Sequence, residues 1–261
     1  MAKTQAHIRY RNKNNEIVPG VTTVLNAVLA KPALLDWAYN CGLQDIDYRT
    51  VRDQAGGIGT IAHGMIMSHL TGVLNAVLAK PALLDWAYNC GLQDIDYRTV
   101  RDQAGGIGTI AHGMIMSHLT GREFDKSDYS EKDISAAENS LIKYWDWEKG
   151  KSVKPVLAET PLVSELYQYG GTIDYLAEIN GEITLIDFKT GKGIYPEMFY
   201  QVAAYSQLLL ENGHLVKDAR ILRIGRDEQE GFEERAIGNL GKYLELYLHA
   251  LAIYKLQKEL K

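Results

Sequence analysis

The sequence predicts an α/β (α+β) fold, in which a central sheet is flanked by helices and an extra helical segment is duplicated. Apolar residues recur at helical spacing in the first half of the chain, at strand spacing in the middle and again at helical spacing near the end. A block of 49 residues also occurs twice in succession, so only 212 of the 261 residues are unique. That unique length fits one domain, which we expect to span residues 1–261.

The repeat consists of residues 24–72 and residues 73–121, which are identical copies of an N-terminal helical segment. Each copy has the pattern of a helix, a short connection and a second helix. Burying about ten large apolar side chains per copy would gain roughly 15–30 kcal/mol, whereas closing a loop of this length costs only about 3–4 kcal/mol. We therefore expect the surplus copy to pack on itself, on its own domain or on another chain. A homo-oligomer, formed by exchange of a duplicated segment or by another association, is the natural outcome.

The composition excludes several classes of protein. Charged residues at 23% and hydrophobic residues at 46% are typical of a globular chain and not of a disordered one. No apolar run approaches about 18 residues, so we expect no membrane partner. The two cysteines, Cys41 and Cys90, are copies of one residue, which argues against a disulfide framework and favours a cytoplasmic protein. The net charge of −5 argues against coating nucleic acid by bulk charge, but it permits a local basic groove.

The N-terminal part of the chain is predicted to form a hairpin followed by helices. Residues 7–18 fit a short β-hairpin with Asn14 and Asn15 at its turn. Pro32 lies inside the first helical pattern and is expected to kink that helix or to start a new one. A later helix is expected over residues 133–148, ended by Gly150.

The middle of the chain is predicted to form the sheet. Asn180 and Gly181 separate two apolar runs, and Asn-Gly is the strongest short signal for a hairpin turn. Gly170 and Gly171 are expected to break the strand pattern before this hairpin. The expected strands cover residues 153–158, 162–167, 172–179, 183–188, 219–224 and 232–237, with helices over residues 198–211 and 241–260.

Two aspartates on the predicted hairpin define the candidate site. Asp174 and Asp187 lie on either side of the turn, so both carboxylates can project from one end of the sheet. Carboxylates about 4 Å apart repel by roughly 4 kcal/mol at an effective dielectric near 20, and Mg²⁺ or Mn²⁺ offsets this repulsion best. Lys189 points to the same face as Asp187, where its ammonium can steady a water nucleophile or a developing phosphorane charge.

Four further residues can complete this site. Gln201 and Tyr205 share one face of a helix, from which they can reach a phosphate or hold Lys189, although Tyr205 can equally be a core residue. Glu159 precedes the hairpin and can support the site; a surface glutamate is the alternative. His112 lies on a predicted helix, where a neutral imidazole can supply another metal ligand.

In this order the motifs resemble the PD-(D/E)XK nuclease superfamily, and within it the RecB-like branch, which includes phage and mitochondrial single-strand exonucleases. The resemblance runs from about residue 18 to residue 205, with one copy of the repeat as surplus. It depends on Gly108-Thr109-x-x-His112, Glu159, Gly171-x-x-Asp174, Asp187-x-Lys189-Thr190 and Gln201-x-x-x-Tyr205. The cysteines of iron–sulfur members and any helicase motif are missing from this sequence.

The resemblance implies a restriction-endonuclease-like mixed sheet and metal-dependent hydrolysis of DNA phosphodiester bonds. The catalytic group it implies comprises Asp174, Asp187, Lys189, Glu159 and Gln201. The Mg²⁺ or Mn²⁺ ligands it implies are Asp174, Asp187, His112 and the backbone carbonyl of Phe188. The resemblance implies that Gln201 and Tyr205 hold the DNA strand. Thr190 and Lys192 are further expected DNA contacts, Lys192 as part of a local basic rim for phosphates, with an ordinary surface lysine as the alternative.

Two questions stay open at this point. His63 has the same sequence context as His112; His112 is preferred because less chain separates it from the sheet, but a swapped assembly could supply the His63 of another chain. The expected function is an exonuclease acting on single-stranded DNA or DNA ends, in the cytoplasm or, if phage-encoded, in the host cytoplasm. The alternatives are an endonuclease or flap nuclease with the same core, and a catalytically idle DNA-binding or assembly module.

Overall fold

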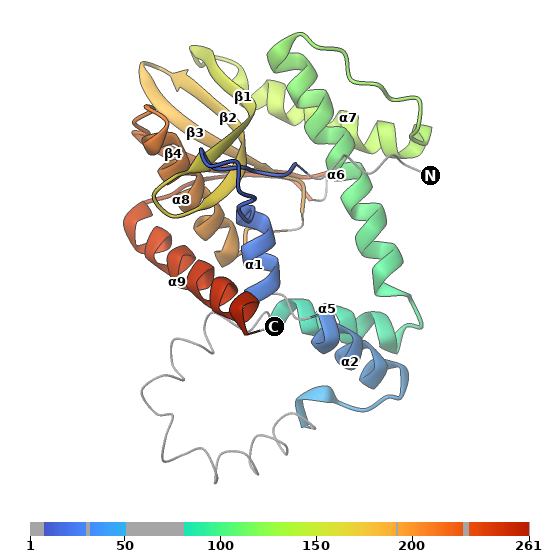
Figure 1. Ribbon diagram of the computed structural model, residues 1–261. Helices are drawn as coiled ribbons and strands as arrows, with labels where there is room; N and C mark the ends of the chain where they lie inside the picture. The colour runs from blue at the N-terminus through green and yellow to red at the C-terminus, as the bar shows by residue number, and fades with distance from the viewer. Residues whose placement is uncertain (1–7, 30–31, 51–80, 192, 227–229, 261) are drawn as a thin grey trace. The chain divides into compact units, whose positions relative to one another are not determined.

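The computed structural model describes residues 8–29, 32–50, 81–191, 193–226 and 230–260 (Figure 1). Contacts within the chain divide it into two compact units. The first consists of Met1–Leu25 and Ala104–Lys261, and the second of Asn26–Gln103. The expectation of a single nuclease domain over residues 1–261 stays a prediction.

The first unit is built around a five-stranded mixed sheet. In order across the sheet, its strands are β1 (Val153–Ser164), β2 (Tyr169–Ile179), β3 (Glu182–Lys189), β4 (Asp218–Ile224) and β5 (Phe232–Ala236). Strands β3 and β4 are parallel, and the other neighbours are antiparallel. Helix α8 (Pro196–Glu211) connects β3 to β4, because parallel neighbours need a crossover. The predicted α/β layout with a restriction-endonuclease-like mixed sheet is confirmed.

Helices cover both faces of this sheet. Side chains of α6 (Tyr97–Thr120) and α7 (Glu131–Glu148), such as Met116 and Tyr144, pack in one cluster with sheet residues that include Ile186, Phe188 and Leu222. Helix α8 contacts β1 to β4, and α9 (Leu240–Glu259) packs against α8. Figure 1 shows α8 and α9 on the opposite side of the sheet from α6 and α7. Burial is therefore concentrated in the central strands β2, β3 and β4, whereas the outer strands β1 and β5 keep many exposed residues.

The hairpin that carries the candidate site has the predicted turn. Asn180 and Gly181 have φ angles of 52° and 93°, the left-handed values that a two-residue type I′ turn needs at both positions. Ile179 pairs with Glu182, and the antiparallel register continues to Tyr175 opposite Ile186. The turn therefore sets which residues of β2 and β3 face each other.

Two expectations about the strands are wrong. Gly170 and Gly171 lie inside β2 and do not break it, because a Cβ at Gly170 would lie 2.3 Å from the Tyr10 ring and one at Gly171 would lie 2.6 Å from the Tyr205 ring. They are glycines because other side chains approach the strand. Likewise, residues 153–158 and 162–167 are not two strands: β1 continues through Pro161, which an edge strand tolerates because proline lacks an N–H to donate.

The N-terminal hairpin is present in the described residues 8–18, while His7 lies outside them. Arg11 bridges Ile17, the N–H of Val18 donates to the carbonyl of Tyr10 at 3.0 Å, and Asn15 takes a φ of 64° at the turn. Gly20 then forms a parallel bridge with Gly170. This contact places the hairpin beside the start of β2.

The second unit holds a pair of helices with the same sequence. Helix α1 (Val21–Leu29) leads from the first unit, and α2 (Pro32–Leu43) begins at Pro32, so the proline starts a new helix. Helix α5 (Pro81–Leu92) is the counterpart of α2 in the second copy, and the two helices pack against each other. No helix in the described part of the chain is long and apolar enough to cross a lipid bilayer.

Candidate active site

The β2–β3 hairpin brings the two predicted aspartates together. The pairing of β2 with β3 ends at Tyr175 opposite Ile186, and Asp174 and Asp187 are the residues that directly follow this last pair on the two strands. Asp174 Oδ2 accepts a hydrogen bond of 3.0 Å from the N–H of Phe188. Asp187 is fully buried, since β3 lies between β2 and β4.

Lys189 forms an ion pair with Asp187, as their two-residue spacing predicts. Lys189 Nζ lies 2.5 Å from Asp187 Oδ2, yet neither carboxylate oxygen of Asp187 accepts a well-aligned hydrogen bond from the described residues. Burial raises the pKa of Asp187 to about 6, although the charge of Lys189 opposes that rise. Burial alone would lower the pKa of Lys189, but the charges of Asp187 and Asp174 raise it above its usual value.

His112 lies between two carboxylates. Its Nδ1 is 3.4 Å from Glu159 Oε1, and its Nε2 is 3.4 Å from Asp174 Oδ1. Burial by itself lowers the pKa of His112, but the charges of Asp174 and Glu159 outweigh burial and raise the pKa to about 10. Burial likewise raises the pKa of Asp174, whereas His112, Lys189 and the N–H of Phe188 together bring it below its usual value. The imidazole of His112 therefore contacts the carboxylates of both Glu159 and Asp174, which brings three predicted site residues together.

The backbone at Glu159 explains how this side chain reaches the histidine. Glu159 lies within β1, but its φ is 44°, in the left-handed region that non-glycine residues rarely adopt. Such a conformation costs about 1–3 kcal/mol and persists only where surrounding structure enforces it. The strand pairs regularly on either side, with Ala158 opposite Tyr175 and Thr160 opposite Ile173. The strained position turns Glu159 toward His112.

Gln201 and Tyr205 meet on one face of α8, as predicted. The Gln201 side-chain amide donates a hydrogen bond of 2.8 Å to the Tyr205 hydroxyl. Tyr205 is buried against Gly171, and burial together with the charges of Asp174 and Asp187 raises its pKa well above its usual value. Tyr205 is therefore both a core residue and a neighbour of the aspartates.

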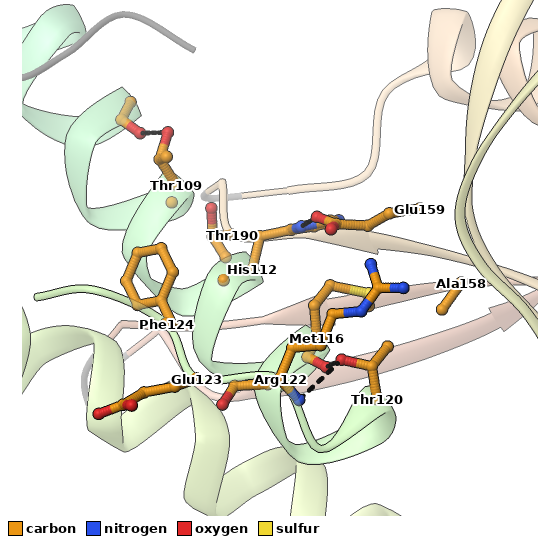
Figure 2. A pocket seen from close by; sticks show the side chains of 14 residues that line it. Thr109, His112, Met116, Thr120, Arg122, Glu123, Phe124, Ala158, Glu159 and Thr190 are labelled. Atoms are coloured by element: carbon orange, nitrogen blue, oxygen red, sulfur yellow. Dashed lines mark hydrogen bonds and ion pairs between the residues drawn. The ribbon is translucent and has the colours of Figure 1, made fainter.

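A cavity of about 590 Å³ opens beside this group. Figure 2 shows His112 and Glu159 side by side at the cavity, with Thr190 next to α6. Gly108 makes this approach possible, because a Cβ there would lie 2.5 Å from Thr190 Oγ1. Asp174, Asp187 and Lys189 are not among the lining residues, so the aspartates lie behind His112 and Glu159 with respect to the cavity.

Several cavity residues escaped the sequence analysis. Arg122, Phe124 and Ser117 line it, and Arg122 is the one arginine or lysine among the described lining residues. The available signal was glycine in a helix: Gly108 and Gly113 lie in α6, where glycine is unfavourable unless something approaches closely. A Cβ at Gly113 would lie 2.3 Å from the Phe124 ring. Lys192 and His63 lie outside the described residues, and the proposed roles of all site residues stay predictions.

The predicted metal can be tested against the chemistry of these side chains. Asp187 is fully buried, and its pKa is raised by burial even though Lys189 pairs with Oδ2, so a further cation would stabilise its charged form. Within the described residues, however, no three His, Cys, Asp or Glu side chains converge as a ready metal-binding group. Mg²⁺ keeps several waters and is often held by only one or two carboxylates. The donor set therefore fits such a hydrated ion better than a fully caged one.

Comparisons with known proteins give little further information. No protein-family model and no curated protein matches this chain. Among solved structures, one similar chain is titled a "putative exonuclease" from Eubacterium rectale, with 15% identity and a TM-score of 0.40; the match covers 58% of this chain and 65% of that one, just under two thirds of its length. Another, titled SSO0001, has 11% identity and a TM-score of 0.27 over 56% of this chain and 85% of that one. Both TM-scores are too low to support an inference about function.

Proposed function

We propose that the protein is a metal-dependent DNA nuclease that hydrolyses phosphodiester bonds. The observation that supports this most is the buried pair of Asp187 and Lys189 beside Asp174. A carboxylate that is buried in the core and held mainly by an ion pair with Lys189 is costly. Such a cost is typical of catalytic sites, where groups with perturbed pKa values gather next to a cavity.

The site residues are proposed to have separate roles in binding the metal ion and in orienting the water. Asp174 and Asp187 would hold Mg²⁺ or Mn²⁺, with the backbone carbonyl of Phe188 and, once it is neutral, His112 as further ligands. When bound, the ion supplies Lewis-acid stabilisation of the charge on the phosphate and a more acidic water. Lys189, held by Asp187, would orient the attacking water and stabilise negative charge as the bond breaks.

The remaining site residues are proposed to position the DNA strand and the imidazole of His112. Glu159 would keep the imidazole of His112 oriented through Nδ1. Gln201 would use its amide, which Tyr205 holds, to reach a phosphate. Thr190 at the cavity is proposed to contact the backbone of the DNA, as is Lys192, two residues further along the chain.

We propose single-stranded DNA or DNA ends as the substrate. Phe124 lines the cavity and stacks on Tyr129, with ring centroids 5.9 Å apart and planes 24° apart. Aromatic faces beside a basic side chain such as Arg122 are the elements that bind unpaired bases and phosphates. These features favour an unpaired strand over an intact duplex, and exonucleolytic cleavage is the form we propose.

The deciding experiment compares two asparagine variants of the full chain. We expect D187N to abolish Mg²⁺- or Mn²⁺-dependent digestion of linear single-stranded DNA, and D146N to digest it like the unaltered protein, because Asp146 is an exposed residue of α7 paired with Lys149. Circular single-stranded DNA should survive an exonuclease. Cleavage of the circle would instead indicate an endonuclease, and DNA binding without any turnover would indicate an idle module. Full activity of D187N would exclude this site.

The histidine copies provide a second comparison. We expect H112A to lose most activity and H63A to keep it, since His112 is the copy that contacts Glu159 and Asp174. Equal partial losses in the two variants would contradict the assignment to His112 and would indicate that both copies serve the site in different molecules.

A further inference from the structure

The two copies of the repeat meet through the same surface. Helices α2 and α5 share the sequence PALLDWAYNCGL and pack against each other. A Cβ at Gly42 would lie 2.2 Å from the carbonyl oxygen of Tyr88, and a Cβ at Gly91 would lie 2.2 Å from that of Tyr39. Each Cβ would also be 3.0 Å from the Cα of the opposite glycine. The helices therefore touch where neither has a side chain, and the contact is reciprocal.

Polar side chains around the glycines repeat this reciprocity. Two carboxylates each accept hydrogen bonds from a tyrosine and an arginine of the other copy: Asp36 from Tyr97 and from Arg98 at 2.6 Å, and Asp85 from Tyr48 and from Arg49 at 2.7 Å. Each donor pair is the 49-residue counterpart of the other. A contact in which residue i meets j, and j meets i, is an isologous interface, the kind that forms a two-fold dimer.

Aromatic rings complete the contact and depend on the partner copy. The ring of Tyr48 lies 5.3 Å from that of Tyr88 at 57°, and the ring of Tyr97 lies 5.4 Å from that of Tyr39 at 58°. Tyr48 and Tyr97 are only 1% and 2% exposed. A copy without its counterpart would uncover these rings and leave their hydroxyls without the opposite aspartate.

We propose that residues 32–50 are a self-association segment, whose partner is a second copy of the same sequence. In a chain with one copy, the helix pair must be completed by another chain, so the 212-residue single-copy chain is a homodimer. The duplication supplies the second copy within one molecule. This inference does not depend on the proposed nuclease activity.

In the duplicated chain, the two segments should pair with each other more often than with the segments of another chain. Fewer than 40 residues join Leu43 at the end of α2 to Pro81 at the start of α5. A tether of this order gives an effective concentration near the millimolar range. The full chain is therefore expected to be monomeric in dilute solution, with a mass of 29.2 kDa, although its segment retains the capacity to pair with another chain.

The test uses the full chain and reverses charges in one copy. In D36R/R49D, the basic side chain introduced at position 36 faces Arg98, and the acidic one introduced at position 49 faces Asp85, so pairing within the chain is repulsive. Between chains, however, two reversed copies attract each other, and so do two unaltered copies. Because the original side chains are 38–48% exposed, low ionic strength should be used to limit screening.

We expect light scattering at low ionic strength to show a doubled mass, or larger assemblies, for the one-copy reversal. Reversing both copies, by adding D85R and R98D, restores opposite charges within the chain and should return the mass to 29.2 kDa. A one-copy reversal that remains monomeric at concentrations above about 100 μM would overturn the proposal. So would an equal mass for all three proteins.

The single-copy chain provides an independent test. Deleting residues 73–121 or residues 24–72 gives the same 212-residue protein, which we expect to be a dimer. G42L should make it monomeric, since even a Cβ at Gly42 meets backbone at 2.2 Å. The matched change G241L, where a Cβ would meet nothing within 4 Å in α9, should leave it dimeric. A folded, monomeric single-copy chain by circular dichroism and light scattering would refute the proposal.

Discussion

At an ordinary strand position, a glycine variant is less stable than an alanine variant. At Glu159, where the backbone is left-handed, we expect the glycine variant to be the more stable of the two. Both E159A and E159G remove the carboxylate, and with it the 3.4 Å ion pair to His112. Because Glu159 is 44% exposed, that pair contributes less than about 1 kcal/mol, and its loss is common to both variants. The difference between the two variants therefore reports the backbone.

The magnitude follows from the φ of 44°. The left-handed region costs a residue with a Cβ about 1–2 kcal/mol, whereas the additional backbone entropy of glycine costs about 0.5–1 kcal/mol. We therefore expect the free energy of unfolding of E159G to exceed that of E159A by about 0.5–1 kcal/mol. At Lys154, an exposed position of the same strand whose φ is not positive, K154G should instead be less stable than K154A by about 0.5–1 kcal/mol.

Urea denaturation of the four variants measures these differences as shifts of the midpoint at constant slope. A nuclease assay should find E159A and E159G equally impaired, because each loses the group that holds Nδ1 of His112. The reasoning is refuted if E159G is no more stable than E159A while the Lys154 pair shows its expected order.

Three further predictions concern buried contacts. G171A should lower stability by about 1–3 kcal/mol and impair cleavage, because the new Cβ would lie 2.6 Å from the Tyr205 ring; an unchanged melting temperature would contradict this. G108A should lower the free energy of unfolding and narrow the cavity, because the new Cβ would lie 2.5 Å from Thr190 Oγ1. In a T190A background the same change should instead stabilise α6 by up to about 1 kcal/mol. Denaturation of the two single variants and the double variant would measure both effects. Burial, with a smaller contribution from a nearby carboxylate, raises the pKa of Tyr175 to about 12. Above pH 10 the unfolded chain therefore loses this proton before the folded chain does. The contribution of Tyr175 to the free energy of unfolding then falls by about 1.4 kcal/mol per pH unit. Y175F should make the fall between pH 10 and 12 shallower by that amount, and identical slopes would count against it.

Much of the fold follows from local sequence. The Asn180-Gly181 turn fixes the β2–β3 register because both residues take left-handed φ angles. Helix α7 ends before Gly150, which has a φ of 77°. These features depend on a few neighbouring residues, so the sequence is enough to predict them. The break expected at Gly170 and Gly171 was wrong because their reason is tertiary: Tyr10 and Tyr205, far away in the chain, approach the strand there.

The candidate site likewise contains residues that sequence patterns predict and residues that they miss. The spacing of Asp174, Asp187 and Lys189 across a tight turn predicts that they meet, because strand alternation and antiparallel register are local rules. Arg122 and Phe124 were missed because the loop after α6 has no motif of its own, and only the packing of Phe124 against Gly113 places it at the cavity.

Sequence patterns predicted most elements in their order, the hairpin that carries the two aspartates and the two identical segments. They did not determine that Asp187 is fully buried, that His112 lies between Glu159 and Asp174, or that the two segments pair through Gly42 and Gly91. Periodicity and turn chemistry act between residues close in sequence. Burial, desolvation and close helix contact depend on residues brought together from distant parts of the chain, so they become apparent only in the folded structure.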